Sequence, residues 1–430
     1  MFKRLTCFFL AFLLVFSSSL SPLSAFEPSP EDRALLSKIE KDTSQYFTRF
    51  SDKLTGLTKD SSRTGSPTSV AATGFALAAY AIAGSRGWIP QDYAYGRILT
   101  TLRTLRHKAA HQEGFFYHFL DSSTGKRVWG SEASSIDTAL VVAGALLAAQ
   151  YYPGTEADKL AREIYERVNW KWMMNGSDFL CMGWTPESKF LPYYWDSYNE
   201  LMILVALAVG SPTFPIPPGA WERWLRPEGD YNGHKIVYAS TGALFTYQFS
   251  HAYINFRKLD DQGVNFFENS REATLANREY SQSFALQHKG YSEFSWGLSS
   301  SLGPGGYRAY GGKPGGGIQD GTVAPYAALS SIVFTPELSS KATRFFFESY
   351  QKELYGKFGF KDAFNLDKGW WATEYLGIDQ GITLLMLENY LNDEIVWKKF
   401  MELPAIKKWI ELTGLNSRSA STAKTNAPKS

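Results

Sequence analysis

The sequence predicts an all-α protein, an (α/α)6 barrel built from six helical hairpins closed into a ring. Two kinds of segment alternate along the chain, six apolar on nearly every side and six amphipathic and charged. A helix that is apolar all round is buried, whereas an amphipathic helix covers a core and faces water. No β-strand alternation of useful length competes with this pattern. We therefore expect six inner helices around an axis and six outer ones.

The two sets of helices can be assigned by residue number. The predicted inner helices, rich in small residues, span 69–84, 134–149, 197–210, 240–254, 322–334 and 377–391. The predicted outer helices span 31–50, 91–107, 155–170, 220–225, 264–285 and 336–354. Two short helices over 394–401 and 405–413 are expected to close the ring, and the Ser-, Lys- and Asn-rich residues 416–430 are predicted to be a disordered tail.

The first 25 residues have the pattern of a secretory signal peptide. Lys3 and Arg4 precede an apolar run that begins at Cys7, and a Ser-rich stretch ends at Ala25. The apolar run is shorter than the about 20 residues that a membrane helix needs. We expect a periplasmic or secreted monomer without a membrane span after cleavage, with residues 26–415 as one barrel domain. Cys181 is then the single remaining cysteine, which excludes an intrachain disulfide.

Composition narrows the class of partner. The net charge of +2 and the absence of a basic run argue against nucleic acid, which is bound through clustered Lys and Arg. Aromatic residues make up 16% of the chain, with 13 Trp and 24 Tyr, many of them in Gly-containing polar loops. A large core also uses aromatic residues, but in loops their flat faces suit sugar rings. An uncharged carbohydrate is the predicted partner.

Long loops precede the predicted inner helices. They span 52–68, 108–133, 171–196, 286–321 and 355–376, whereas the returns to the outer helices are mostly short. The long loops should therefore gather at one end of the barrel. Loops of more than about 12 to 15 residues in a compact domain usually carry function.

Four acids, Asp137, Glu200, Asp320 and Asp379, lie at or just before the first turns of inner helices. Acids are also good helix-start residues, because they complement exposed N–H groups and the helix dipole. Four of them on helices otherwise almost without charge favour a catalytic cluster instead. Glycoside hydrolysis needs one protonated and one ionised carboxyl group. Glu200 follows an aromatic-rich stretch that can exclude water and raise its pKa, so we assign it as the acid.

Other chemistries have weaker support. The six His residues show no metal-ligand spacing, so no metal and no cofactor are expected. His118 could reach the cleft and hydrogen-bond a sugar. The Gly-rich segments 303–307 and 311–317 lack the features of a phosphate loop and more plausibly form a loop that approaches the ligand, bringing Tyr307 with it.

Several ordered motifs resemble one enzyme family. They include Ser131-Glu132-Ala133-Ser134-Ser135-Ile136-Asp137, Tyr198-Asn199-Glu200, Trp296-Gly297-Leu298, Asp320-Gly321-Thr322 and Gly377-Ile378-Asp379-Gln380-Gly381. The chain resembles the glucoamylase-like glycoside hydrolases, in particular glycoside hydrolase family 144, the bacterial β-1,2-glucanases. The resemblance implies an (α/α)6 fold and hydrolysis of β-1,2-linked glucose chains with inversion at the anomeric carbon.

The resemblance also implies roles for individual residues. Glu200 corresponds to the general acid and Asp379 to the general base, which acts on water through a substrate hydroxyl. The candidate substrate-binding residues are Glu132, Asp137, Asp320, His118, Tyr198, Trp195, Trp296, Tyr307 and Trp371. One position departs from the family pattern, because Leu302 stands where the family usually has an Asp. This departure predicts a change in substrate choice.

Alternatives to a β-1,2-glucan hydrolase remain at this point. One is a different enzyme on an (α/α) barrel, either a polysaccharide lyase or a glucosidase for another linkage. A lyase neutralises a uronate with Arg, Lys or a metal and abstracts a proton with Tyr or His, whereas the cleft-forming helices here carry acids. The other alternative is a catalytically silent glycan-binding protein, which would not need both Glu200 and Asp379.

Overall fold

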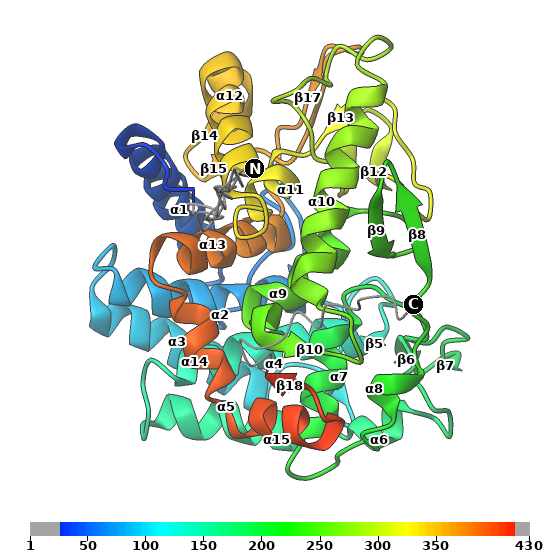
Figure 1. Cartoon of the computed structure of the whole chain (residues 1–430). Coiled ribbons are helices and arrows are strands. Elements are labelled where there is room, and N and C mark those ends of the chain that lie inside the picture. The colour runs from blue at the N-terminus through cyan, green and yellow to red at the C-terminus, as the bar shows by residue number, and fades with distance from the viewer. Residues whose placement is uncertain (1–25, 418–430) are drawn as a thin grey trace, which may run out of the picture.

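The structure, a computed structural model, describes residues 26–417 (Figure 1). The predicted signal peptide, residues 1–25, and residues 418–430 of the predicted tail lie outside the described residues. The first two residues of that tail form strand β18 (Asn416–Ser417), which pairs antiparallel with β10 (Leu259–Asp260). Within the described residues, no helix is both long and apolar enough to cross a membrane.

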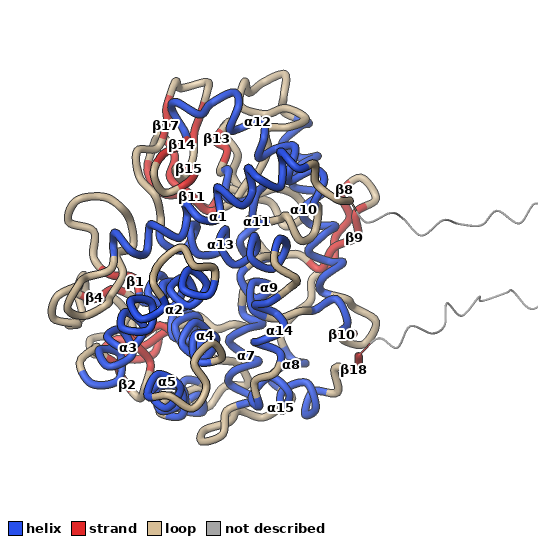
Figure 2. The backbone as a smooth tube through the Cα atoms, turned by 90° about the vertical axis from the view of Figure 1, so that its left-hand side faces the viewer, coloured by secondary structure: helices blue, strands red, loops and turns tan. Residues whose placement is uncertain are grey.

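Among residues 26–417, six helices form the inner ring, and the prediction of an (α/α)6 barrel is confirmed. Their residues are almost all buried, which explains why their sequences are apolar on every side. They are α2 (Val70–Ser85), α4 (Ser135–Ala149), α7 (Leu201–Gly210), α9 (Phe249–Tyr253), α11 (Pro325–Ser330) and α13 (Gly377–Leu391). Figure 2 shows the arrangement of the helices and the loops that join them.

Two inner helices are shorter than the sequence predicts. The segment 240–254 holds a 3-10 turn, η1 (Leu244–Tyr247), before α9, so only its last part is α-helical. In the segment 322–334, helix α11 begins at Pro325, because proline is well suited to a first helical position. The two residues 322 and 323 form a strand instead.

The outer ring consists of amphipathic helices, as predicted. Its members are α1 (Pro30–Phe50), α3 (Gln91–His107), α5 (Glu156–Glu166), α8 (Ala220–Arg223), α10 (Phe266–Ser283) and α12 (Pro336–Leu354). Helix α8 is a single turn, and α15 (Pro404–Thr413) packs against α7 beside it. Helix α14 (Ile395–Met401) packs on α9 and α13, while α6 (Trp170–Met173) and η2 (Phe256–Lys258) are short turns.

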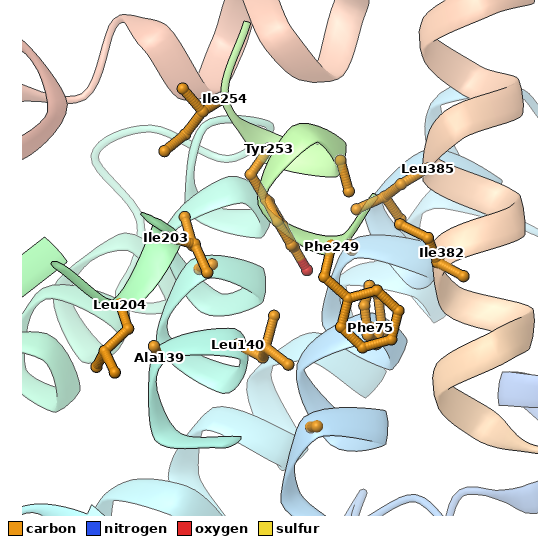
Figure 3. Close-up of a cluster of buried hydrophobic side chains, with 14 of the residues drawn as sticks. Phe75, Ala139, Leu140, Ile203, Leu204, Phe249, Tyr253, Ile254, Ile382 and Leu385 are labelled. Carbon is orange, nitrogen blue, oxygen red and sulfur yellow. The ribbon is translucent and has the colours of Figure 1, made fainter. Parts of the chain in front are cut away.

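The inner helices pack closely around the axis. Glycines let α2 and α4 touch, because a Cβ atom on Gly144 would lie 2.0 Å from the carbonyl oxygen of Gly74. Apolar side chains from five inner helices fill the space between them, including Phe75, Leu140 and Phe249 (Figure 3). The candidate site lies directly against this core.

Short strands connect the loops, and the sequence analysis did not find them, because most are only two residues long. Two antiparallel hairpins have four-residue strands, β8 (Glu228–Tyr231) with β9 (His234–Val237) and β11 (Ser300–Gly303) with β12 (Gly306–Ala309). In the described part of the chain, three other two-stranded sheets pair β1 (Thr68–Ser69) with β4 (Phe119–Leu120), β2 (His111–Gln112) with β3 (Phe115–Phe116), and β14 (Tyr355–Gly356) with β15 (Gly359–Phe360). Two sheets in this part have three strands. Their strand orders are β5 (Ala133–Ser134), β6 (Gly183–Thr185), β7 (Lys189–Phe190) and β13 (Thr322–Val323), β16 (Phe364–Asn365), β17 (Trp370–Trp371).

These pairings tie the long loops to one another at one end of the barrel. The β1–β4 pairing joins loop 52–68 to loop 108–133, and a bridge between Ser61 and Leu376 joins loop 52–68 to loop 355–376. The backbone N–H of Leu302 donates to Asp362, which connects loop 286–321 to loop 355–376. The predicted clustering of the long loops is therefore confirmed for these four.

Candidate active site

Three of the four predicted acids surround one cavity. Asp137, Glu200 and Asp379 line a cavity of about 180 Å³ at the ends of α4, α7 and α13. Leu140 and Phe249, which belong to the core, form part of its wall. The three acids therefore converge because the inner helices that carry them begin at the same end of the barrel.

None of these three acids caps a helix through its side chain, although Glu200 occupies the N-cap position of α7. Ser134 caps α4, and Asn199 accepts a hydrogen bond from the backbone N–H of Leu201 at the start of α7. Glu200 and the N-cap residue of α13 make no capping hydrogen bond through a side chain. Capping through the side chain therefore does not explain these acids, although Asp137 and Asp379 do lie in the first turns of their helices.

A wider cavity continues from the first one toward the loops. Its volume is about 450 Å³, and it shares His118, Tyr307 and Ile378 with the inner cavity. The exposed rings of Trp129 and Tyr307 stand in its wall. The two cavities together make a cleft with a polar, acid-lined inner end and an aromatic outer part, which is the combination that sugar recognition uses.

Glu200 has the properties of a proton donor. Burial raises the pKa of its carboxyl group to about 7, and the negative charge of Asp137 contributes in the same direction. A carboxyl group with this pKa is protonated in a substantial fraction of molecules at neutral pH. Glu200 is the residue immediately before α7, whose residues belong to the apolar core.

Asp379 has a second carboxyl group beside it. Burial and the neighbouring Asp362 hold the pKa of Asp379 well above its ordinary value. Burial also raises the pKa of Asp362, to about 6. Asp60, in the loop after α1, faces the same region and adds to the raised pKa of Asp379.

His118 bridges two acids in the cleft. Its Nδ1 atom lies 3.1 Å from Glu132, and its Nε2 atom lies 3.6 Å from Asp137. Burial opposes protonation of the ring, but Asp137 and Glu132 outweigh it and raise the pKa of His118 to about 9. The ring is therefore a cation at neutral pH, held in place by two carboxylates.

The same trio is the donor set that could hold a metal ion among the described residues. One ligand atom from each of His118, Glu132 and Asp137 lies within 4.8 Å of the others. A metal ligand must be a neutral imidazole, whereas the raised pKa of His118 favours the protonated ring. The arrangement suits an ion-paired imidazolium that orients the acids and donates to a sugar hydroxyl.

Asp320 lies apart from the other acids. Its carboxylate accepts hydrogen bonds from the backbone N–H and the hydroxyl of Thr322 and from the hydroxyl of Tyr310. It lines neither of the two cavities. Asp320 has a structural role, because it precedes strand β13 and stabilises the turn there.

The predicted aromatic residues divide into two groups. Tyr307 lines both cavities, as predicted. Four others line neither cavity and pack within the protein instead: Tyr198, Trp195, Trp296 and Trp371. Tyr198 stacks on Phe266, Trp371 stacks on Phe364, and the indole N–H of Trp195 donates to Ser135. Sequence position near a motif did not distinguish these core rings from cleft rings.

Residues that the sequence analysis did not single out complete the cleft. Asp60, Arg63 and Glu374 line the wider cavity, and Tyr326 lines the inner one. Asp60 and Asp362 both lie in long loops that were predicted to carry function. A search for acids in those loops, in addition to acids at helix starts, would have found them.

A carboxyl-lined cleft at the mouth of an (α/α)6 barrel defines the class of glycoside hydrolases built on this fold, and comparisons with known proteins agree. Residues 192–404 match the Glycoamylase family, a glucoamylase family. The chain is similar to the glucoamylase-like glycoside hydrolases, and among them to β-1,2-glucanases of the family 144 type.

Three similar proteins illustrate the relationship. An exo β-1,2-glucooligosaccharide sophorohydrolase (non-reducing end) from Parabacteroides distasonis is 27% identical over 88% of this chain, and the chain spans 58% of that relative's length. An endo-β-1,2-glucanase from Chitinophaga pinensis, solved with sophorotriose and glucose, superposes with a TM-score of 0.83 at 28% identity, covering 89% of this chain and 98% of the other. A β-1,2-glucanase structure from P. distasonis gives 0.83 at 26% identity, covering 89% and 60%.

Proposed function

We propose that this protein hydrolyses β-1,2-linked glucans or their oligosaccharides with inversion, using Glu200 as general acid and Asp379 as general base. The observation that carries the proposal is that both residues line one cavity, with the pKa of Glu200 raised to about 7. The substrate class is supported by the sophorohydrolase and the sophorotriose-bound glucanase to which the chain is similar. An inverting mechanism uses one carboxyl group as acid and the other as base, which are the roles proposed for Glu200 and Asp379.

Each residue has a defined part in the reaction. Glu200 donates its proton to the glycosidic oxygen as the bond to the anomeric carbon breaks. A water molecule attacks from the opposite face, and its proton passes, through a substrate hydroxyl, toward Asp379. His118, charged and fixed by Asp137 and Glu132, donates a hydrogen bond to a sugar hydroxyl. Trp129 and Tyr307 offer ring faces to glucose units farther out.

We also propose that the protein works outside the cytoplasm. The support is the signal-peptide pattern of residues 1–25 and a substrate class that is polymeric and uncharged. Export of a fusion that carries these residues, compared with the same fusion in which Lys3 and Arg4 are replaced, tests the location.

The test of the activity is product analysis. Linear β-1,2-glucan and sophorose should be cleaved, β-1,3- and β-1,4-linked glucans should not, and proton NMR during the reaction should show the α-anomer first. Asp178→Asn changes an exposed acid paired with Arg223 and serves as a matched control that keeps wild-type turnover. Release of the β-anomer would replace the inverting mechanism by a retaining one with a covalent intermediate. Cleavage of another linkage alone would overturn the substrate assignment.

A further inference from the structure

Two carboxyl groups meet beneath the candidate active site, and the proposed function uses only one of them. Asp379 lies in the first turn of α13, and Asp362 lies in the loop between β15 and β16. Their exposed fractions are 2% and 1%, and the two carboxyl groups lie close enough for each to shift the pKa of the other. Two ionised carboxylates offer only acceptors, so this contact requires a proton between them.

The other atoms of the pair support a single shared proton. Asp362 Oδ2 accepts a hydrogen bond from the backbone N–H of Leu302 at 2.6 Å, which favours a negative charge on Asp362. Asp362 Oδ1 and Asp379 Oδ2 are buried and receive no hydrogen bond from a donor among the described residues. A proton held by one of these carboxyl groups and accepted by the other satisfies groups that would otherwise be costly to bury.

The surroundings of the pair contain no compensating cation in direct contact. The titratable groups that face the pair are Asp60, Glu374, Tyr46, Tyr307 and Tyr326. Two are acids and three are neutral hydroxyls, so none supplies a positive charge. The charges of His118 and Arg63 act on Asp60, one step farther out. Asp60 and Glu374 therefore oppose full ionisation of the pair, while the Leu302 N–H and the Tyr326 hydroxyl favour a single negative charge on it.

We propose that Asp362 is a positioning residue of the reaction, which shares one proton with Asp379 so that the pair, as a monoanion, is the base. This inference rests on the proposed function, which places Asp379 at the reacting water. Leu302 fixes Asp362, and Asp362 in turn fixes the orientation of Asp379 toward the cavity.

The proton balance of the step is simple. The O–H bond of the attacking water breaks, its oxygen bonds to the anomeric carbon, and its proton enters the pair, which becomes neutral with two protons. The proton of Glu200 goes to the leaving oxygen. After product release the pair loses one proton to solvent and Glu200 regains one, which restores the starting state.

The pair can be observed directly by carbon NMR of full-length protein labelled at the aspartate carboxyl carbons, titrated between about pH 4 and pH 10, the ordinary range from aspartate to tyrosine. We expect one buried aspartate to remain protonated through neutral pH in the wild type. Asp362→Asn keeps the size of the side chain and its acceptor for Leu302, and in this variant Asp379 should titrate lower by about one pH unit or more. Asp178→Asn should leave the titration unchanged.

A second readout connects the pair to turnover. Asp362→Asn should lower kcat by about tenfold or more, within the range of acid–base effects, while KM stays within about threefold. A change in KM alone would assign Asp362 to substrate binding and overturn its role in the base.

The outcomes separate the two proposals. A wild type in which every aspartate is ionised at neutral pH overturns the shared proton, even if Asp362→Asn does not fold. A protonated pair in a protein that cleaves no glucan overturns the proposed function and leaves the pair intact.

Discussion

Helix α13 carries a buried carboxyl pair near each of its ends, and the two pairs differ in what surrounds them. Asp379, near the N-terminal end, meets Asp362, while Glu388, in the last turns, meets Glu40 of α1. All four side chains are at most 2% exposed. Burial and the neighbouring acid raise the pKa of Glu40 to about 10, much as they raise that of Asp379.

Polar neighbours surround the pair formed by Glu388 and Glu40, which we call the closed pair because it does not face the cleft. Asn392 donates hydrogen bonds to both Glu388 and Glu40, at 2.6 and 3.3 Å, and Arg86 lies 3.9 Å from Glu388. Neither glutamate lines the two cavities of the cleft. Asp379 of the Asp pair lines a cavity together with Glu200. A perturbed pKa is useful for catalysis only where a substrate and a second acid can reach the group.

The largest expected effect is a loss of kcat at the active-site acids, with no loss at the closed pair. Glu200→Gln and Asp379→Asn should each lower kcat by about 10² to 10⁴-fold, or roughly 3 to 5 kcal/mol of barrier, because each removes a positioned proton donor or acceptor. Glu40→Gln, the same kind of change in the closed pair, should leave kcat unchanged. Steady-state kinetics on a β-1,2-glucooligosaccharide decides this. If a variant of Glu200 or Asp379 keeps more than about a tenth of wild-type kcat, the catalytic role assigned to that residue is wrong.

The pH dependence of activity should follow the Glu200 carboxyl. Since burial raises its pKa to about 7, kcat/KM should fall as pH rises through that value and the acid loses its proton. Asp137→Asn removes a negative charge that raises this pKa, so the alkaline limb should move to lower pH. A pH profile of kcat/KM for both proteins is the measurement, and an unmoved limb would mean that another group sets it.

The closed pair should affect the free energy of unfolding of the protein but not its activity. Because the pKa of Glu40 is about 10 in the folded protein and 4.5 ordinarily, the folded state keeps a proton that the unfolded chain loses between these values. The free energy of unfolding therefore falls as pH rises through this window. Glu40→Gln imitates the protonated group, so it should raise Tm near about pH 9 by a few degrees. In a large domain, each kcal/mol of added stability raises Tm by about 2 to 4 °C. Thermal melts near about pH 5 should coincide, and parallel curves at all pH values would contradict the assignment.

The smallest expected effect concerns the outer cleft. Leu302 lines the wider cavity beside Tyr307, at the position that departs from the family pattern. Leu302→Asp should change the ratio of activities on long and short glucans by a few-fold, because it alters a wall while Glu200 and Asp379 remain. Leu286→Asp is the matched control, since Leu286 is fully exposed in the same long loop. An equal ratio in both variants would show that the Leu302 side chain does not contact the sugar.

Some site residues can be recognised from the sequence, and others cannot. Asp137, Glu200 and Asp379 could be grouped from their shared position at helix starts, and the structure brings them to one cavity. Asp320 shared that signal but holds a turn through Thr322. The aromatic residues were harder, because whether a ring such as Trp296 faces the core or the cleft depends on contacts far along the chain.

The sequence by itself determined the barrel, the order of its helices and the end at which the long loops gather. Helix periodicity and loop length are local properties, and they specify burial and connection without knowledge of distant partners. Only the tertiary structure decided which loop acid joins which helix acid. Asp362 and Asp379 are 17 positions apart and Glu40 and Glu388 are 348 apart. Pairing depends on side chains meeting in space, where burial and a neighbouring carboxyl group change the pKa of both partners.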